Sequence, residues 1–109
     1  MSTIAYTVIA ETESEDSLRA YVDWLTQGHI RDVIQAGALS GTVVRLDRAE
    51  GAVFAAEARY VFGSREDFQR YESGPAVALR AEGIALFGPE SEHPMRFRRT
   101  LGGVVATLP

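Results

Sequence analysis

The sequence predicts one α+β domain, residues 1–109, whose elements follow in the order strand, helix, strand, strand, helix, strand. Three observations support this fold class. A length of 109 residues suits a single hydrophobic core. Four short apolar segments bounded by turn residues are typical of strands, and two segments begin with helix-capping residues. The composition, 46% hydrophobic and 24% charged, is that of a globular domain and not of a disordered chain.

The first strand and the first helix are expected in residues 3–36. In residues 3–11 both alternating faces are mostly apolar, which predicts a strand covered on both sides. Ser14 can cap the helix that follows, and two acidic residues in the first turn suit the helix dipole. We expect this helix to run to about Ala36, with Gly28 suiting a local bend, and to end at Gly37, which can adopt the left-handed conformation.

A hairpin is expected next, with strands at residues 39–48 and 52–62. The polar loop between them ends in Gly51, a typical hairpin signal. Ser64 then opens a second helical region, with Asp67 placed as its capping-box partner.

The rest of the chain predicts a broken helix, a last strand and a tail. Gly74 and Pro75 interrupt the second helical region, which resumes and ends before Gly88. The fourth strand is expected at residues 95–101. We expect residues 102–109 to form a C-terminal tail, with a glycine hinge followed by apolar residues.

Right-handed crossovers and short connections make this order the ferredoxin-like βαββαβ fold, an antiparallel sheet with spatial order 4-1-3-2. The charges agree, because edge strands need them to deter edge-to-edge pairing. The two predicted edge strands carry arginines, namely Arg45, Arg48, Arg96, Arg98 and Arg99, and the two central strands are the most apolar.

A homodimer is expected, because two helical regions cover only one face of a four-stranded sheet. The uncovered face would expose apolar residues of the first strand, a patch that soluble monomers rarely carry. A second sheet packed on this face would cover it. The tail at residues 102–109 then crosses to the partner subunit; the alternative is that it folds back on its own sheet edge.

Two segments resemble a small, functionally uncharacterised bacterial family of the dimeric α+β barrel superfamily. Residues 24–33 (WLTQGHIRDV) are similar to its first helix, and residues 71–83 (YESGPAVALRAEG) are similar to its second helical region. The resemblance implies packing as a dimeric α+β barrel, but no activity. Its distant kin include antibiotic-biosynthesis-type, quinone-forming monooxygenases that need no cofactor, polyketide cyclases, muconolactone-type isomerases and haem-binding enzymes. Fold analogy of this kind is a weak guide to function.

Composition and missing motifs exclude several classes of protein. The net charge of −4 argues against a nucleic-acid partner, and no apolar run is long enough to cross a membrane. The chain has no cysteine, no glycine-rich nucleotide loop, no nucleophile elbow and no zinc-ligand spacing, so no cofactor and no metal are expected. With no signal segment at the N-terminus, the expected location is cytoplasmic.

His29 is the candidate catalytic residue. On an unbroken helix it falls at the centre of an apolar stripe that faces the sheet and that contains Leu18, Val22, Leu25, Val33 and Ala36. An imidazole buried there without a hydrogen bond costs roughly 1–3 kcal/mol. His29 is therefore a hydrogen-bonded core histidine, a proton acceptor lining a ligand cavity, or a haem or metal ligand.

Six further residues are candidates for the walls of a ligand pocket. Tyr6 and Tyr21 could orient a carbonyl or phenol near His29, or could be core residues. Trp24 lies almost opposite the stripe on an ideal helix, as a dimer contact, a pocket lid or an exposed aromatic. Glu57 and Arg59 share one face of the third strand, where Arg45 could meet them in an ion pair or a polar pocket wall.

Two functions remain open on the sequence. The first is a cofactor-independent oxygenase, cyclase or isomerase acting on a small aromatic or polyketide-like molecule. The second is a non-catalytic module that binds a small ligand or another protein. The space around His29 distinguishes them, because an open cavity with polar groups favours the enzyme and a packed core favours the module.

Overall fold

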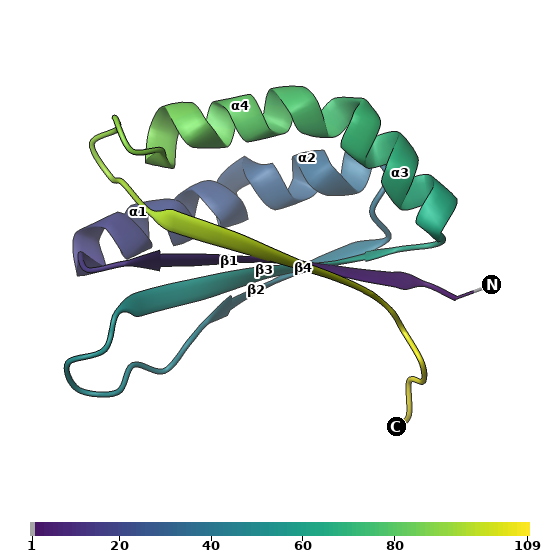
Figure 1. The fold of residues 1–109 in the computed structure, drawn as a ribbon, viewed down its shortest axis with the longest axis horizontal. Helices are drawn as coiled ribbons and strands as arrows, with labels where there is room; N and C mark the ends of the chain where they lie inside the picture. Colours follow the sequence, from purple (N-terminus) through teal and green to yellow (C-terminus); the bar gives the residue numbers. More distant parts are fainter. Residues whose placement is uncertain (1) are drawn as a thin grey trace.

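A computed structural model describes residues 2–109 and has helices on one face of a four-stranded antiparallel sheet (Figure 1). The strands are β1 (Ile4–Thr12), β2 (Ser40–Arg45), β3 (Phe54–Phe62) and β4 (Arg96–Gly103). The helices are α1 (Glu15–Trp24), a π-helical turn η1 (Leu25–His29), α2 (Ile30–Gln35), α3 (Arg65–Ser73) and α4 (Pro75–Phe87).

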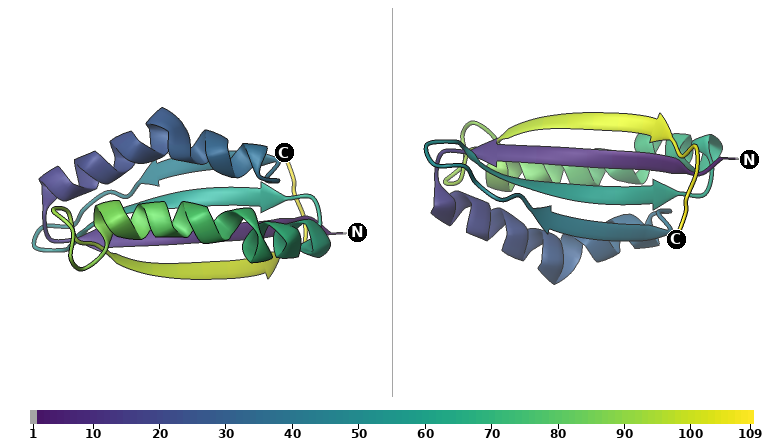
Figure 2. Two further views of the ribbon diagram at one scale, coloured as in Figure 1. Left: turned by 90° about the horizontal axis from the view of Figure 1, so that it is seen from above. Right: turned by 90° about the horizontal axis from the view of Figure 1, so that it is seen from below.

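The sheet order is β2-β3-β1-β4, so the predicted ferredoxin-like order 4-1-3-2 is confirmed. Tyr6 at the middle of β1 pairs with Tyr60 on β3 and with Leu101 on β4. Residues at these paired positions point toward the helices, and their neighbours in each strand point to the other face. Seen from above, α1, η1 and α2 run on the β2 side of the sheet, and α3 and α4 run on the β4 side (Figure 2).

The hydrophobic core fills the space between the sheet and the helices. Its largest fully buried side chains are Phe62, Leu18, Leu25 and Val33. Two predicted caps hold the helices in place, because Ser14 accepts a hydrogen bond from the Ser17 backbone and Ser64 accepts one from the Asp67 backbone. None of the helices in residues 2–109 is long and apolar enough to cross a membrane.

The first helical region extends to Gln35, close to its expected end, and it is divided by η1, which contains Gly28, where a local bend was expected. Two other predicted boundaries were wrong. The hairpin strands are shorter, because the Arg48 side chain folds over the Phe54 ring and donates to the Ala52 carbonyl, which holds the loop in place. The last strand is longer: Gly103 pairs with Ile4, so the predicted glycine hinge belongs to β4.

The tail at residues 104–109 leaves β4 on the side of the sheet that carries no helix (Figure 1) and turns toward the β2 side (Figure 2). One backbone hydrogen bond, from Val104 to Thr3, holds its first residue. Beyond it Val105 is 100% exposed and Leu108 is 83% exposed. These two apolar side chains of the tail are therefore exposed in the single chain.

Candidate functional site

A cavity lies between the helix-facing side of the sheet and the inner sides of α1, η1 and α4. Its volume is about 70 Å³, several times what one water molecule needs. The lining residues are Tyr6, Val8, Tyr60, Phe97 and Arg99 from the sheet, and Tyr21, Trp24, His29, Tyr71, Leu79, Arg80, Gly83 and Ile84 from the helices. Most are aromatic or aliphatic, with a few converging polar groups, as is typical of small-ligand sites.

The π turn η1 brings Trp24 and His29 to the same side of the helix. The Ile30 backbone N–H bonds to the Leu25 carbonyl five residues earlier, and Gly28 inside the turn departs from helical backbone angles. On a regular α-helix, residues five apart point about 140° away from each other. In the structure the two rings stack, with centroids 4.0 Å apart and planes inclined by 20°. The opposite placement of Trp24 and His29 that an ideal helix would give is therefore not observed, because the helix departs from ideal geometry at the inserted turn.

Helix α4 fixes the indole from the other side. Trp24 Nε1 donates to Glu82 Oε1 at 3.2 Å. The neighbouring Gly83 lies close to the indole, and a Cβ at that position would be in van der Waals contact with Trp24 Cη2 at 3.4 Å. Trp24 thus links α1 to α4 and supports the His29 ring.

The His29 imidazole is neutral at neutral pH and has an unused nitrogen. Its Nδ1 is buried and has no hydrogen-bond partner among the described residues. Burial lowers the pKa of His29 below its ordinary value, and the charges of Glu82 and Asp32 oppose this shift. A buried histidine nitrogen normally has a hydrogen-bond partner, so the unpartnered Nδ1 of a cavity-lining residue makes His29 a candidate functional group.

A second polar group lies where α4 passes over β4. The Tyr6 hydroxyl accepts a hydrogen bond from Arg99 Nε at 3.0 Å and a longer one from Arg80 Nη2 at 3.4 Å. Tyr6 itself is only 4% exposed. Two guanidinium groups from different elements therefore converge on one phenol at the wall of the cavity.

The other tyrosines of the cavity are neutral hydrogen-bond donors. Burial raises the pKa of Tyr71 to about 12 and raises the pKa of Tyr21 and Tyr60 further. With the phenols un-ionised at neutral pH, each hydroxyl can donate a proton to a ligand oxygen.

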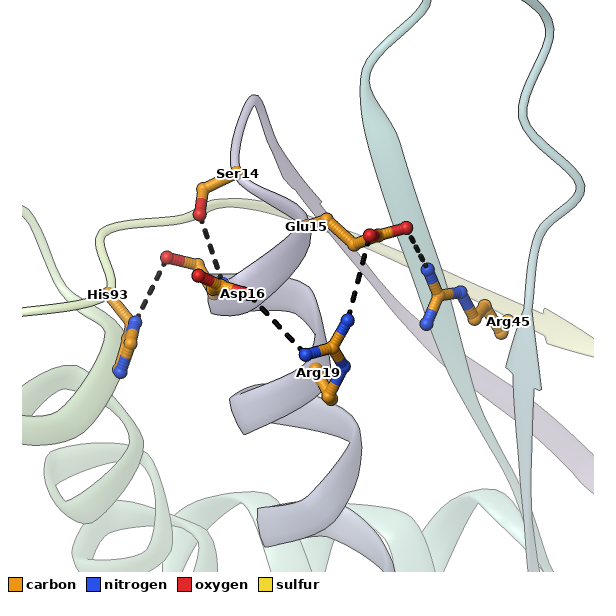
Figure 3. A network of polar contacts seen from close by, with 7 residues as sticks. Ser14, Glu15, Asp16, Arg19, Arg45 and His93 are labelled. Carbon is orange, nitrogen blue, oxygen red and sulfur yellow. Dashed lines mark hydrogen bonds and ion pairs between the residues drawn. The ribbon is translucent and has the colours of Figure 1, made fainter.

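The structure brings four of the seven predicted site residues together: His29, Tyr6, Tyr21 and Trp24 all line this cavity. It places Arg45, Glu57 and Arg59 elsewhere. Glu57 and Arg59 form an ion pair at 2.8 Å on the helix-free face. Arg45 pairs in register with Ala56 and so points to the opposite face, where it meets Glu15 at 3.2 Å (Figure 3). The expectation that Arg45 meets Glu57 was wrong because the two alternate across the pleat.

Sequence reasoning missed Tyr60, Tyr71, Arg80 and Arg99. Arg99 was grouped with Arg96 and Arg98 as a charge on the sheet edge. Because side chains alternate along a strand, Arg99 points to the opposite face of the sheet from both of them. It shares the helix-facing side with Phe97, two residues earlier, and that spacing could have revealed it. For Arg80 no local signal was available, because its role depends on where α4 crosses the sheet.

A serine–histidine pair occurs outside the cavity. Ser17 Oγ and His93 Nδ1 are 3.0 Å apart, which ties the loop after α4 to the start of α1 (Figure 3). Ser17 is only 4% exposed, so a substrate cannot reach its hydroxyl. The pair anchors the loop. In residues 2–109 there is also no cluster of three metal-ligating side chains.

Solved structures with the same fold include oxygenases. A dimeric ferredoxin-like protein from an uncultured marine organism aligns with a TM-score of 0.73 and 14% identity, over 99% of each chain. SnoaB, a cofactor-independent oxygenase from Streptomyces nogalater, aligns at 0.60 and 19% identity, over 100% of this chain and 99% of its own. A monooxygenase from the gene ActVA-Orf6 of Streptomyces coelicolor, in complex with the ligand nanaomycin D, aligns at 0.62 and 18%, over 99% and 93%.

At these identities the likeness concerns the fold alone. No protein of curated function matches the sequence. The sequence pattern of the family described as "Domain of unknown function (DUF4286)" matches residues 1–102. That match spans nearly the whole chain, including both helical regions and all but the last residue of β4, and the protein therefore belongs to the DUF4286 family.

Proposed function

We propose that the protein is a homodimer that acts, without a cofactor, on a small aromatic or polyketide-like molecule bound in the cavity between helices and sheet, with His29 as the base. One observation carries the proposal: a neutral, half-buried imidazole with an unpartnered Nδ1 lines a cavity whose walls are mostly aromatic. Such a site has both a hydrophobic place for a ring and a group able to accept a proton.

The chemistry follows from these groups. His29 accepts a proton from an acidic C–H or O–H of the bound molecule, and the stacked Trp24 holds its ring in position. The neutral tyrosine hydroxyls donate to the oxygen on which negative charge develops. The enolate or phenolate formed this way can react with O₂ directly, close a ring, or be reprotonated at another carbon as an isomer.

Proteins of the same fold are compatible with this chemistry. Two proteins of this fold are a cofactor-independent oxygenase and a monooxygenase that holds nanaomycin D. Transferring that activity to this chain is our inference from the cavity and not from the fold.

Dimerisation has two supports. Two similar structures are of dimeric ferredoxin-like proteins. In this chain the sheet has helices on one face only, and an apolar tail extends on the other side with Val105 and Leu108 exposed. A second copy packed on that face would cover both features.

Anthrone, a tricyclic ketone with an acidic CH₂ group, is a direct probe of the proposed reaction. Its oxidation by O₂ converts CH₂ to C=O and releases one water, and the quinone absorbance and O₂ uptake report the rate. We expect the protein to accelerate this oxidation and His29→Gln to lower the rate by roughly 10²–10⁴. The matched control is His93→Gln, which changes the other histidine, outside the cavity.

The alternative is a ligand-binding module without chemistry, and the lack of a second base among the lining residues favours it. Trp24 is the single tryptophan, so its fluorescence reports binding separately from turnover. Anthrone that changes the fluorescence but is not oxidised faster than in buffer supports the module and rejects the enzyme.

A further inference from the structure

We propose that the cavity selects an anionic ligand, an aromatic or conjugated carboxylate or enolate, whose charged oxygens bind Arg99, Arg80 and the Tyr6 hydroxyl. This inference rests on the proposed ligand pocket and specifies what enters it. The ring of the ligand then lies against the aromatic walls that lead to His29, and its anionic group lies where α4 crosses β4.

The hydrogen bonds of Tyr6 give the first argument. A phenol oxygen has two lone pairs and one proton. The Tyr6 hydroxyl already accepts from Arg99 and from Arg80, so its proton remains free to donate. The hydrogen-bonding positions that Tyr6, Arg80 and Arg99 still offer to a ligand are therefore this proton and the unused N–H groups of the two guanidiniums. All of them are donors. A carboxylate or enolate accepts from all of them, whereas a neutral amide also brings donors that would find no acceptor here.

The charges give the second argument. Arg80 has one carboxylate partner, Glu72 at 3.3 Å, and Glu72 is about half exposed. No carboxylate lies within ion-pair distance of Arg99 in the part of the chain that the structure describes, and none of the cavity-lining residues is acidic. The wall is therefore positively charged in a protein whose net charge is −4. Two cations that meet at one oxygen repel each other, and an anion between them relieves that repulsion.

The position of the two arginines gives the third argument. Arg80 belongs to the α4 helix and its side chain is 33% exposed, and Arg99 lies on the edge strand β4. A charged ligand group at this place can keep part of its hydration while its ring enters the apolar interior. That arrangement avoids the cost of burying a carboxylate completely.

Benzoate and benzamide test the proposal on the unmodified protein, because they share a ring and a carbonyl and differ in charge. Binding is followed by Trp24 fluorescence. We expect benzoate to bind at least about tenfold more tightly than benzamide, as charge-assisted hydrogen bonds exceed neutral ones. We also expect the preference to weaken as salt is added, because the group is partly exposed.

Substitutions of arginine test whether Arg99 is responsible for the preference for benzoate. Arg99→Gln should reduce the affinity for benzoate by about tenfold or more and leave that for benzamide unchanged. Arg99→Lys should fall between, since it keeps the charge but loses the planar donor group. Arg31→Gln is the control: it removes the same charge from an exposed position on α2 that does not line the cavity.

Each outcome decides between the proposals. Equal affinity for benzoate and benzamide, or an Arg99→Gln variant that binds benzoate as tightly as Arg31→Gln does, overturns the anion site while the ligand pocket stands. If neither compound changes Trp24 fluorescence at any soluble concentration, the ligand pocket itself is rejected and the anion site with it.

Discussion

His29 is half-buried against Trp24, and its Nδ1 is buried without a partner, which makes folding of the chain sensitive to pH. Burial lowers the pKa of His29 in the folded protein, whereas in the unfolded chain the imidazole takes up its proton near pH 6.5. Below that pH the unfolded state therefore binds more protons than the folded state. The contribution of His29 to stability is present above pH 6.5 and is lost as the pH falls through the folded-state pKa.

We expect the free energy of unfolding to fall between about pH 7 and pH 5 more steeply in the wild type than in His29→Gln. Urea denaturation at several pH values measures this difference. Other groups titrate in both proteins and cancel in the comparison. Identical pH profiles for the two would mean that the imidazole is as easily protonated in the folded protein as in water.

At the scale of the element, the π turn η1 decides what the first helix presents to the cavity. One extra residue in the turn rotates everything after it relative to α1. The energetic cost of the turn is offset by the Trp24–His29 stack and by the Trp24–Glu82 hydrogen bond. A helix kept regular through this segment would separate the two rings.

Deletion of Gln27, an exposed residue inside η1, should convert the π turn to an α turn. We expect the folded protein to persist, because Leu18, Leu25 and Val33 still face the core. His29 then follows Trp24 by four residues, which places both rings on one face of a regular helix, so Trp24 should keep the pH-dependent fluorescence change that protonation of the stacked imidazole causes. A pH titration of Trp24 fluorescence measures this, with Gln27→Ala as the control that keeps the length. A titration abolished by the deletion would contradict the role given to the turn, which is to accommodate one extra residue between the two rings.

At the scale of the whole molecule, the exposed tail and the helix-free face lead to an assembly prediction. We expect sedimentation at micromolar concentration to give twice the chain mass of 11.9 kDa. Removing residues 104–109 should weaken the dimer, because burying a valine or leucine contributes about 1.5–3 kcal/mol, which corresponds to about tenfold or more in the dissociation constant.

A charged residue introduced into the tail tests whether the apolar side chains of the tail stabilise the dimer. Val105→Asp places a carboxylate at an apolar tail position and should weaken the dimer as the deletion does. Thr107→Asp adds the same charge at a polar position of the same tail and is the matched control. A dissociation constant that neither the deletion nor Val105→Asp alters would show that the tail takes no part in assembly.

Sequence alone determined the fold class, the strand order and both helix caps. Alternation, capping residues and edge charges are local signals, and each depends on neighbours a few residues away. The same locality explains the errors in the strand boundaries. The glycines of β4 have every local feature of a hinge, but the backbone of β1 provides hydrogen-bond partners and the strand continues.

Only the tertiary structure decided how the cavity is composed. Tyr6, Tyr21, Trp24 and His29 were candidates from the sequence, yet their meeting depends on one π turn that helical periodicity does not reveal. Arg80 and Arg99 converge on Tyr6 from positions far apart in the chain, so no local pattern links them. A site assembled between layers is fixed by how helices cross a sheet, and that crossing results from packing the whole core at once.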